Sequence, residues 1–172
     1  LPELDMNFVK MLGDFKDVDD FKSKIRENIK REKELKEKDK RRIAVIEKII
    51  ENSTIELPKI IIDGETEKML AQFKDDVAKS GLTFEGYLEH IKKSEEDLKS
   101  EWKDTAIKRA KSQVILNTIS KDEGINAKEE DIKREMEYIL AHNKDADRFR
   151  VRMYVDTFLT NELVFKFLES QN

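Results

Sequence analysis

Residues 19–52 read DDFKSKIRENIKREKELKEKDKRRIAVIEKIIEN, and this stretch decides the fold because it predicts one long helix. It contains no glycine or proline, and its apolar residues recur every three to four positions, as on one face of a helix. This apolar stripe consists of Phe21, Ile25, Ile29, Leu35, Ile43, Ile46 and Ile50. Glu32 and Asp39 interrupt the stripe, and burial of unpaired carboxylates is costly. We therefore expect both ends of the helix to be packed and its middle to be exposed.

The exposed middle of this helix can be stabilised by its own charges. Acidic residues precede basic residues by four positions, as in Glu32 with Lys36 and Glu37 with Arg41, and each such pair contributes roughly 0.2–0.5 kcal/mol. Asp19 is expected to cap the start of the helix and Asn52 to mark its end. At about 1.5 Å per residue, such a helix is longer than the core of a domain of this size. The sequence thus predicts a helix that projects as an arm.

The composition limits the classes of function. Basic and acidic residues number 34 and 38 among 172, so the net charge of −4 argues against a protein that binds nucleic acid by neutralising phosphates. No apolar segment approaches the length of a membrane span, which predicts a soluble protein without membrane contact. The absence of cysteine excludes disulfides, thiolate metal ligands and a cysteine nucleophile.

The rest of the chain also has the pattern of helices. Helices are expected to begin after Asp5, Thr83, Ser94 and Asn126, and another with Pro58 at its first position; helix ends are expected at Gly13, Gly81, Gly124 and around His142. Residues 148–159 alternate arginine with apolar residues as a strand would, but a lone strand has no sheet to join, so a helix is predicted there too. The expected fold class is all-α, an elongated multi-helix domain with one long helix and projecting arms.

Several short motifs resemble a known family. They are Leu1-Pro2-Glu3-Leu4, Phe8-Val9-Lys10, Gly13, Ile25-Arg26-x-Asn28 and Ile55-x-Leu57-Pro58 followed by Ile62-Asp63 and Glu65. In this order they resemble the C-terminal domain of trigger factor, a ribosome-associated bacterial chaperone family. The resemblance extends from Leu1 to about Leu168 and is strongest up to about Leu70 and at the end of the helix over residues 114–124. Gly64 departs from it, because the family usually has a better helix former there.

The resemblance implies a fold and a role. It implies a SurA-like helical chaperone fold, with residues 1–172 forming one domain whose body and arms cradle unfolded or nascent polypeptides in the cytoplasm. It implies no cofactor. In the family, contact with the ribosome and prolyl isomerase activity belong to two modules that precede this domain, and we expect both modules to be absent from this chain.

Residues that could support catalysis or metal binding are few. His90 and His142 are the only histidines, and neither has a second imidazole at ligand spacing. The carboxylates lie on charged helix faces and cannot be sorted into a catalytic pair. No phosphate-binding glycine loop or nucleophile elbow is present. The sequence therefore predicts no catalytic site, no metal site and no enzyme.

The candidate binding residues are apolar side chains on the predicted arms. Methionine and aromatic side chains suit a surface that binds many partners, because the thioether chain repacks and a ring offers area at low entropic cost. The candidates for binding substrate polypeptide are Met69, Phe73, Phe84, Tyr87, Ile91, Met136, Ile139 and Met153. Ordinary core packing stays an alternative for each of them, because a core has the same helical spacing.

Two functions are compatible with these features. One is a chaperone module that holds unfolded polypeptides on an apolar-lined surface while charged outer faces keep the complex soluble. The other is a helical scaffold or adaptor with one dedicated protein partner. Glu32 and Asp39 interrupt the apolar seam before three heptads accumulate, which favours the chaperone over a coiled-coil adaptor. A homodimer through exposed apolar patches is compatible with either function.

Overall fold

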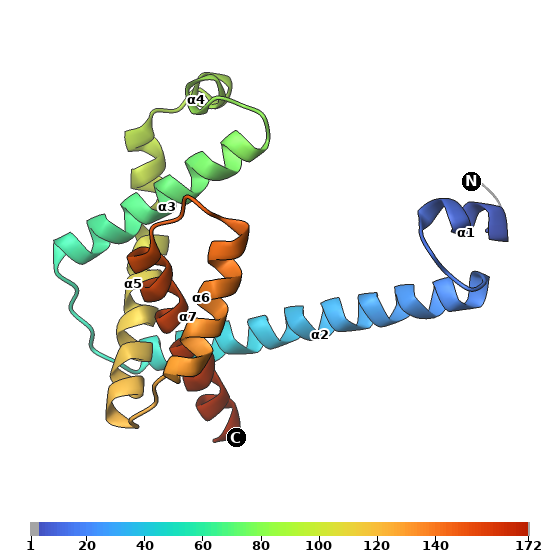
Figure 1. The fold of residues 1–172 in the computed structure, drawn as a ribbon. Helices are drawn as coiled ribbons and strands as arrows, with labels where there is room; N and C mark the ends of the chain where they lie inside the picture. Colours follow the sequence, from blue (N-terminus) through green and yellow to red (C-terminus); the bar gives the residue numbers. More distant parts are fainter. Residues whose placement is uncertain (1–3, 172) are drawn as a thin grey trace. The chain divides into compact units, whose positions relative to one another are not determined.

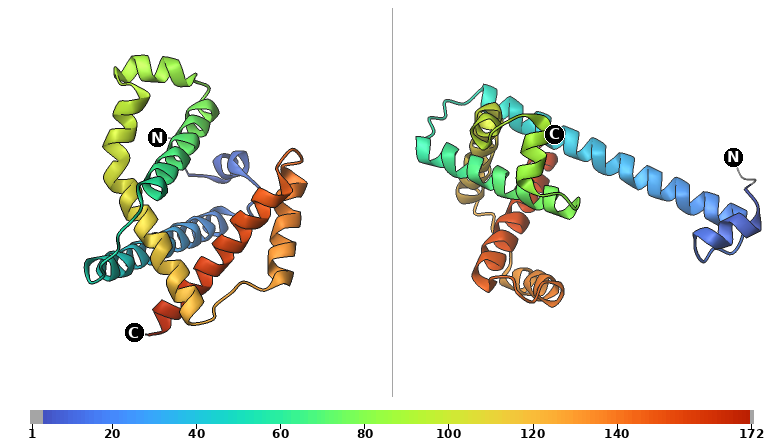
Figure 2. Two further views of the ribbon diagram at one scale, coloured as in Figure 1. Left: turned by 90° about the vertical axis from the view of Figure 1, so that its left-hand side faces the viewer. Right: turned by 90° about the horizontal axis from the view of Figure 1, so that it is seen from above.

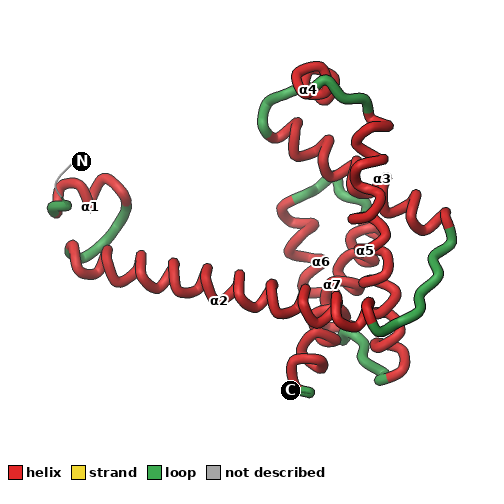
Figure 3. The backbone as a smooth tube through the Cα atoms, turned by 180° about the vertical axis from the view of Figure 1, so that it is seen from behind, coloured by secondary structure: helices red, strands yellow, loops and turns green. Residues whose placement is uncertain are grey.

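The computed structural model of the chain describes residues 4–171 and contains, in that part, seven α-helices and no strand (Figure 1 and Figure 3). They are α1 (Met6–Leu12), α2 (Val18–Glu51), α3 (Lys59–Lys79), α4 (Phe84–Ile91), α5 (Glu95–Asp122), α6 (Glu129–His142) and α7 (Arg148–Ser170). The all-α prediction is confirmed, including the helix predicted from residue 148. None of the described helices combines the length and apolar character that crossing a membrane requires. Leu1, Pro2 and Glu3 of the first family motif lie outside the described residues.

Several helix ends form as their sequences predict. The Asp5 carboxylate accepts a hydrogen bond from the amide N–H of Phe8 at 2.8 Å and caps α1. Ser94 and Asp97 form a capping box at the start of α5, in which each side chain accepts a hydrogen bond from the other residue's backbone N–H. Gly81 follows α3 in the left-handed region with φ of +78°, as a glycine after a helix end commonly does.

Two predicted caps are wrong. Asp17, not Asp19, caps α2, because its carboxylate accepts a hydrogen bond from the N–H of Asp20 at 2.8 Å and the helix already begins at Val18. Asn126 does not cap α6, whose N-cap is Lys128 without a side-chain hydrogen bond. The Asn126 side-chain amide instead donates to the carbonyl of Gly124. The segment before α2 offers several aspartates in succession, whereas α6 begins after Ala127, whose backbone N–H donates a hydrogen bond to the Thr160 hydroxyl of α7.

The contacts within the chain define two compact units, the first ending at Val45 and the second beginning at Ile46. The first unit contains α1 and residues 18–45 of α2. Val9 is fully buried there, and the rings of Phe15 and Phe21 pack edge to face with centroids 5.0 Å apart. Glu32 and Asp39 are exposed, as predicted.

Apolar side chains along the same part of α2 are also exposed. Ile29, Leu35 and Ile43 each leave about half of their surface uncovered, at 47%, 56% and 58%. Ile25 is exposed as well, so the prediction that the apolar beginning of α2 is packed holds for Phe21 but not for Ile25. Charged neighbours stabilise this stretch, among them Lys36, which lies 2.6 Å from Glu32.

One of the cores of the second unit lies where the end of α2, α5 and α7 meet. Its buried residues are Ile46, Ile115, Leu116 and Val164, with Ile49, Ile50, Ile119, Phe165 and Leu168 packed around them. Ile46 and Ile50 of α2 thus pack in the same core as Ile119 of α5. Val114 of α5 is 37% exposed. The buried face of α5 moves to Ile115 and Leu116 because this half of the helix contacts α7 and the end of α2.

The other half of α5 packs against α3, and α4 closes the turn between them (Figure 2). Leu70 and Val77 of α3 and Leu98 and Ala106 of α5 are buried. At the other end of the chain, α6 and α7 form a hairpin around Ile132, Met136, Val151 and Val155. The second unit therefore presents two separate helical substructures, α3–α4–α5 and α6–α7, and each of them contains candidate residues.

Candidate polypeptide-binding surfaces

An aromatic cluster lies where α3, α4 and α5 meet. The ring of Phe73 is at its centre and packs edge to face against Phe84, Tyr87 and Trp102, with centroid distances of 6.3, 5.3 and 5.3 Å. All four side chains are half-buried. Edge-to-face contacts of this kind add about 0.5–1.5 kcal/mol each beyond the area that they bury. The cluster is therefore a structural element that also keeps part of each ring accessible.

A small cleft adjoins this cluster. Its volume is about 160 Å³, and its lining consists of Met69, Gln72, Phe73, Asp76, Trp102 and Arg109. The side-chain amide of Gln72 donates a hydrogen bond of 2.9 Å to the Asp76 carboxylate, so these two polar lining residues are bonded to each other. A cleft of this volume lies well below the roughly 300 Å³ at which typical ligand pockets begin, so it suits one side chain of a bound polypeptide rather than a whole ligand.

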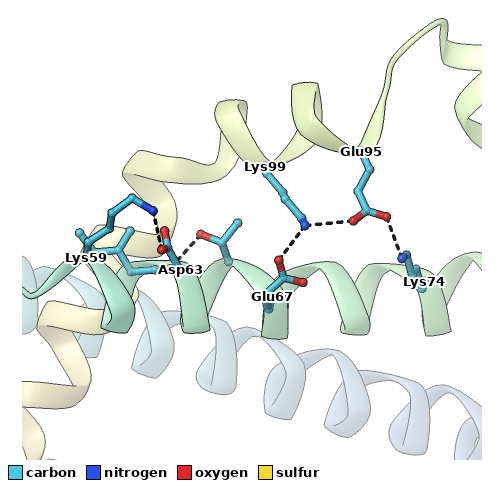
Figure 4. Close-up of polar contacts among 8 residues, drawn as sticks. Lys59, Asp63, Glu67, Lys74, Glu95 and Lys99 are labelled. Carbon is cyan, nitrogen blue, oxygen red and sulfur yellow. Dashed lines mark hydrogen bonds and ion pairs between the residues drawn. The ribbon is translucent and has the colours of Figure 1, made fainter.

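A chain of ion pairs fixes α3 to α5 beside these rings (Figure 4). The ammonium group of Lys99 on α5 lies 2.6 Å from Glu67 on α3 and 3.0 Å from Glu95 on its own helix. Lys74 of α3 donates to the other oxygen of Glu95 at 2.8 Å. The same ammonium group lies 4.7 Å from the centroid of the Phe84 ring. These contacts hold α3, α4 and α5 in one arrangement.

The ion pairs shift the protonation equilibria of their members. Hydrogen bonds from Lys74 and then from Lys99 lower the pKa of Glu95 below its usual value. Hydrogen bonds to Glu67 and then Glu95 raise the pKa of Lys99. Both residues stay charged over the physiological range, which keeps the contact between α3 and α5 formed.

The two candidates on α6 lie in the core of the helical hairpin or at its edge. Met136 is only 6% exposed and packs with Ile132, Val151 and Val155. Ile139 is half-buried and packs against the same cluster. Met136 is thus a core residue, and its side chain is largely covered by α7 in this structure. The helical spacing that made it a candidate reflects core packing at this position.

The outward side of α7 carries large exposed apolar side chains, which we call the α7 face. They are Phe149, Met153, Tyr154 and Phe158, with exposed fractions of 69%, 56%, 63% and 48%. The rings of Tyr154 and Phe158 stack at 6.2 Å with an interplanar angle of 14°. Val151 and Val155 of the same helix are buried in the hairpin core, so these four side chains lie on the parts of α7 that the core leaves uncovered.

A groove between α6 and α7 lies beside Phe149. It has a volume of about 600 Å³ and is lined by Lys133, Met136, Glu137, Arg148, Phe149 and Arg152. Arg152 donates two hydrogen bonds of 2.7 Å to the carboxylate of Glu129 and so joins the beginning of α6 to α7. This pair lowers the pKa of Glu129 and raises that of Arg152.

The structure brings the sequence candidates together in two groups. Met69, Phe73, Phe84 and Tyr87 belong to the cluster and cleft on α3 and α4, and half-buried Ile91 ends α4. Met136, Ile139 and Met153 belong to the hairpin, where only Met153 is exposed.

Sequence reasoning did not identify Phe149, Tyr154 and Phe158 as surface residues. If Val151 and Val155 are placed on the buried side of a helix, the three residues just named fall on its outer faces. The alternation of arginine with apolar residues concealed this signal.

One of the two histidines contacts a neighbouring tyrosine. Nδ1 of His142 lies 2.8 Å from the carbonyl oxygen of Tyr138, and its ring contacts the Tyr138 ring. Across residues 4–171, no three side chains of histidine, aspartate or glutamate gather as they would around a metal ion. The described surfaces are suited to apolar and charged contacts with a macromolecule.

Comparison with known proteins shows which proteins the chain is similar to. Residues 17–168 match the family model described as bacterial trigger factor protein (TF) C-terminus. The trigger factor of Caldicellulosiruptor bescii is 32% identical over 161 residues, which cover 91% of this chain and 36% of that protein. The trigger factor of Clostridium botulinum is 36% identical over 133 residues, covering 77% of this chain and 31% of that protein.

A third relative, the trigger factor of Carboxydothermus hydrogenoformans, is 32% identical over 136 residues, covering 79% of this chain and 32% of that protein. The chain thus spans about a third of the length of these curated relatives. No solved structure matches it.

Proposed function

The chain belongs to the family of bacterial trigger factor C-terminal domains, and on this premise we propose that it is a chaperone module that binds unfolded polypeptides through its exposed apolar side chains. The proposal covers clients that are nascent or denatured and that share no particular sequence. It assigns no chemical step to this chain. The candidate contact surfaces are the α7 face and the accessible edges of the aromatic cluster.

The observation that carries the proposal is the α7 face. A folded protein seldom leaves several large apolar side chains exposed on one helix unless they contact a partner. Here Phe149, Met153, Tyr154 and Phe158 are all exposed while the same helix buries Val151 and Val155. The apolar character of this face therefore exceeds what the hairpin core requires.

The second observation is the kind of side chain involved. Rings and a methionine offer contact area that adapts to different partners, and Phe73, Phe84 and Tyr87 provide further half-buried rings on α3 and α4. Charged residues make up 42% of the chain, which keeps a complex with an apolar client in solution. Binding should be weak and tolerant of sequence, because ordering a client costs much of the contact energy.

The test is binding to a panel of unrelated unfolded polypeptides. Fluorescently labelled, permanently unfolded fragments of several proteins are titrated with the chain and followed by anisotropy, with the natively folded forms of the same proteins as controls. We expect most apolar-rich fragments to bind and the folded forms not to bind. An adaptor with one dedicated partner would ignore nearly all fragments, and that result would refute the proposal.

A further inference from the structure

The small cleft beside the aromatic cluster lies between two rows of side chains, one on each helix, and we call it the α3–α5 cleft. The α5 row consists of Trp102 and Arg109, which are seven positions apart and so lie on one face of the helix, about 10 Å from each other along its axis. The positions between them on this face hold Thr105 and Ala106, whose side chains are short. The α5 side of the cleft therefore has space between two large side chains.

The volume of the α3–α5 cleft corresponds to one ring. It measures about 160 Å³, close to the roughly 150 Å³ of an engineered apolar cavity that binds benzene. A second side chain or a stretch of backbone would not fit beside such a ring. The cleft therefore suits a single side chain of a bound polypeptide, whose backbone stays outside.

The apolar lining favours an aromatic ring over an aliphatic group of equal size. Phe73 and Trp102 pack edge to face with centroids 5.3 Å apart, and a further ring can extend this arrangement. The thioether of Met69 makes favourable contacts with aromatic rings. An aliphatic group would bury the same surface without gaining these contacts.

The two charged residues of the lining differ in their partners. The Asp76 carboxylate accepts the hydrogen bond from Gln72 and lies 3.8 Å from the ammonium group of Lys79. Arg109 makes no hydrogen bond or ion pair within residues 4–171, and no acidic residue lies three or four positions from it on α5. A guanidinium group is attracted to the face of an aromatic ring but not to an aliphatic group.

We propose that the α3–α5 cleft binds one aromatic side chain of an unfolded client, and that Arg109 distinguishes this ring from an equally bulky aliphatic group. The ring packs against Met69, Phe73 and Trp102, and the guanidinium group of Arg109 lies over its face. This inference rests on the proposed function, because it specifies which client side chains one of the binding surfaces selects. It does not concern the α7 face.

The test uses Trp102, the only tryptophan of the chain, whose fluorescence reports on this cleft. The intact chain is titrated with peptides of one leucine-containing sequence that carry phenylalanine, cyclohexylalanine or alanine at a central position. Unlabelled peptides are followed by Trp102 emission, and fluorescein-labelled versions by anisotropy, which detects binding anywhere on the chain. From Trp102 emission we expect the phenylalanine peptide to bind about threefold more tightly than the cyclohexylalanine peptide, which has the same bulk but no aromatic face. The alanine peptide should leave the emission unchanged.

The variant Arg109→Gln should lower the affinity for the phenylalanine peptide to that for the cyclohexylalanine peptide and leave the latter unchanged. The control is Lys103→Gln, which removes an exposed cation of the same helix that does not line the cleft and should keep the preference. Circular dichroism checks that both variants are folded.

The outcomes separate this inference from the function on which it rests. Unchanged Trp102 emission while the labelled phenylalanine peptide binds would overturn the inference and leave the proposed chaperone function standing. Equal affinities for the two ring-containing peptides, a preference that survives in Arg109→Gln, or an equal emission change with the alanine peptide would do the same. If no peptide and no unfolded fragment binds, the proposed function itself fails.

Discussion

At the scale of single residues, Met136 and Met153 illustrate how one residue type serves two purposes on neighbouring helices. Met136 fills the space between α6 and α7, whereas Met153 leaves more than half of its surface to solvent. Both belong to helical apolar patterns, and nothing in the local sequence distinguishes them. Their surroundings differ only once α6 and α7 have packed.

The two methionines provide a matched pair for mutation. Met136→Ala should lower the free energy of unfolding by about 2–4 kcal/mol, because it leaves a cavity in the hairpin core. Met153→Ala should change it by less than about 0.5 kcal/mol, because an exposed side chain buries little. Urea denaturation of both variants measures this difference. Equal effects would show that the burial of these two residues is misassigned.

Glycines provide a second contrast at this scale. Gly64 lies within α3, and a Cβ atom added there meets nothing within 4 Å. Gly64→Ala should therefore stabilise the chain by about 0.5–1 kcal/mol, since glycine is a poor helix former. Gly81→Ala should destabilise it by about 1 kcal/mol, because its φ of +78° suits glycine. Thermal unfolding followed by circular dichroism tests both signs, and a destabilising Gly64→Ala would contradict the account.

At the scale of elements, contacts between residues close in sequence were predictable. The choice among several possible caps, and the helix faces that are buried, were not. The capping box of Ser94 and Asp97 formed as expected because each partner lies within one helical turn of the other. The cap of α2 was misassigned because Asp17, Asp19 and Asp20 are all suitable residues. The buried face of α5 was not predictable, because it depends on two different neighbours along the length of the helix.

The charged stretch of α2 leads to a prediction about hydrogen exchange. Amides from Ile29 to Ile43 should exchange faster than those of Ala106 and Leu116 in α5, because their helix turns have exposed side chains and little packing. Exchange followed by NMR at one pH makes the comparison residue by residue. Protection as strong as that of α5 would mean that this stretch of α2 is covered in solution.

The ion pairs between α3 and α5 predict a dependence of stability on pH. The pKa of Glu95 in the folded chain is lower than its ordinary value of 4.5, because it accepts hydrogen bonds from Lys74 and Lys99. Its stabilising contribution is therefore complete above the unfolded pKa and is lost as the pH falls through the lower folded value. Urea midpoints of the wild type and Glu95→Gln should converge as the pH falls from 6 toward 3. A difference that stays constant with pH would contradict this assignment.

At the scale of the whole molecule, the fold class and the family were within reach of the sequence. Long glycine-free stretches and regular caps indicated an all-α chain, and the short motifs indicated the trigger factor family. The positions of the candidate apolar side chains were only partly predictable. Met69, Phe73, Phe84 and Tyr87 lie together on α3 and α4, whereas the exposed residues of α7 could be recognised only after Val151 and Val155 were known to be buried.

The central claim is that exposed apolar side chains of α7 hold unfolded polypeptides, and a set of matched variants tests it. The α7 variant combines Phe149→Gln, Met153→Gln and Phe158→Gln. The control combines Ile60→Gln, Ile61→Gln and Leu82→Gln, which removes three exposed apolar side chains from other parts of the second unit. Glutamine keeps the helix propensity high, so both variants should unfold within about 1 kcal/mol of the wild type.

The most direct measurement is light scattering of a chemically denatured model protein that is diluted into buffer containing each form of the chain. We predict that the wild type and the control suppress aggregation at a several-fold molar excess, and that the α7 variant loses most of this activity although its unfolding midpoint is unchanged. Full suppression by a folded α7 variant, or no suppression by the wild type, would contradict the account.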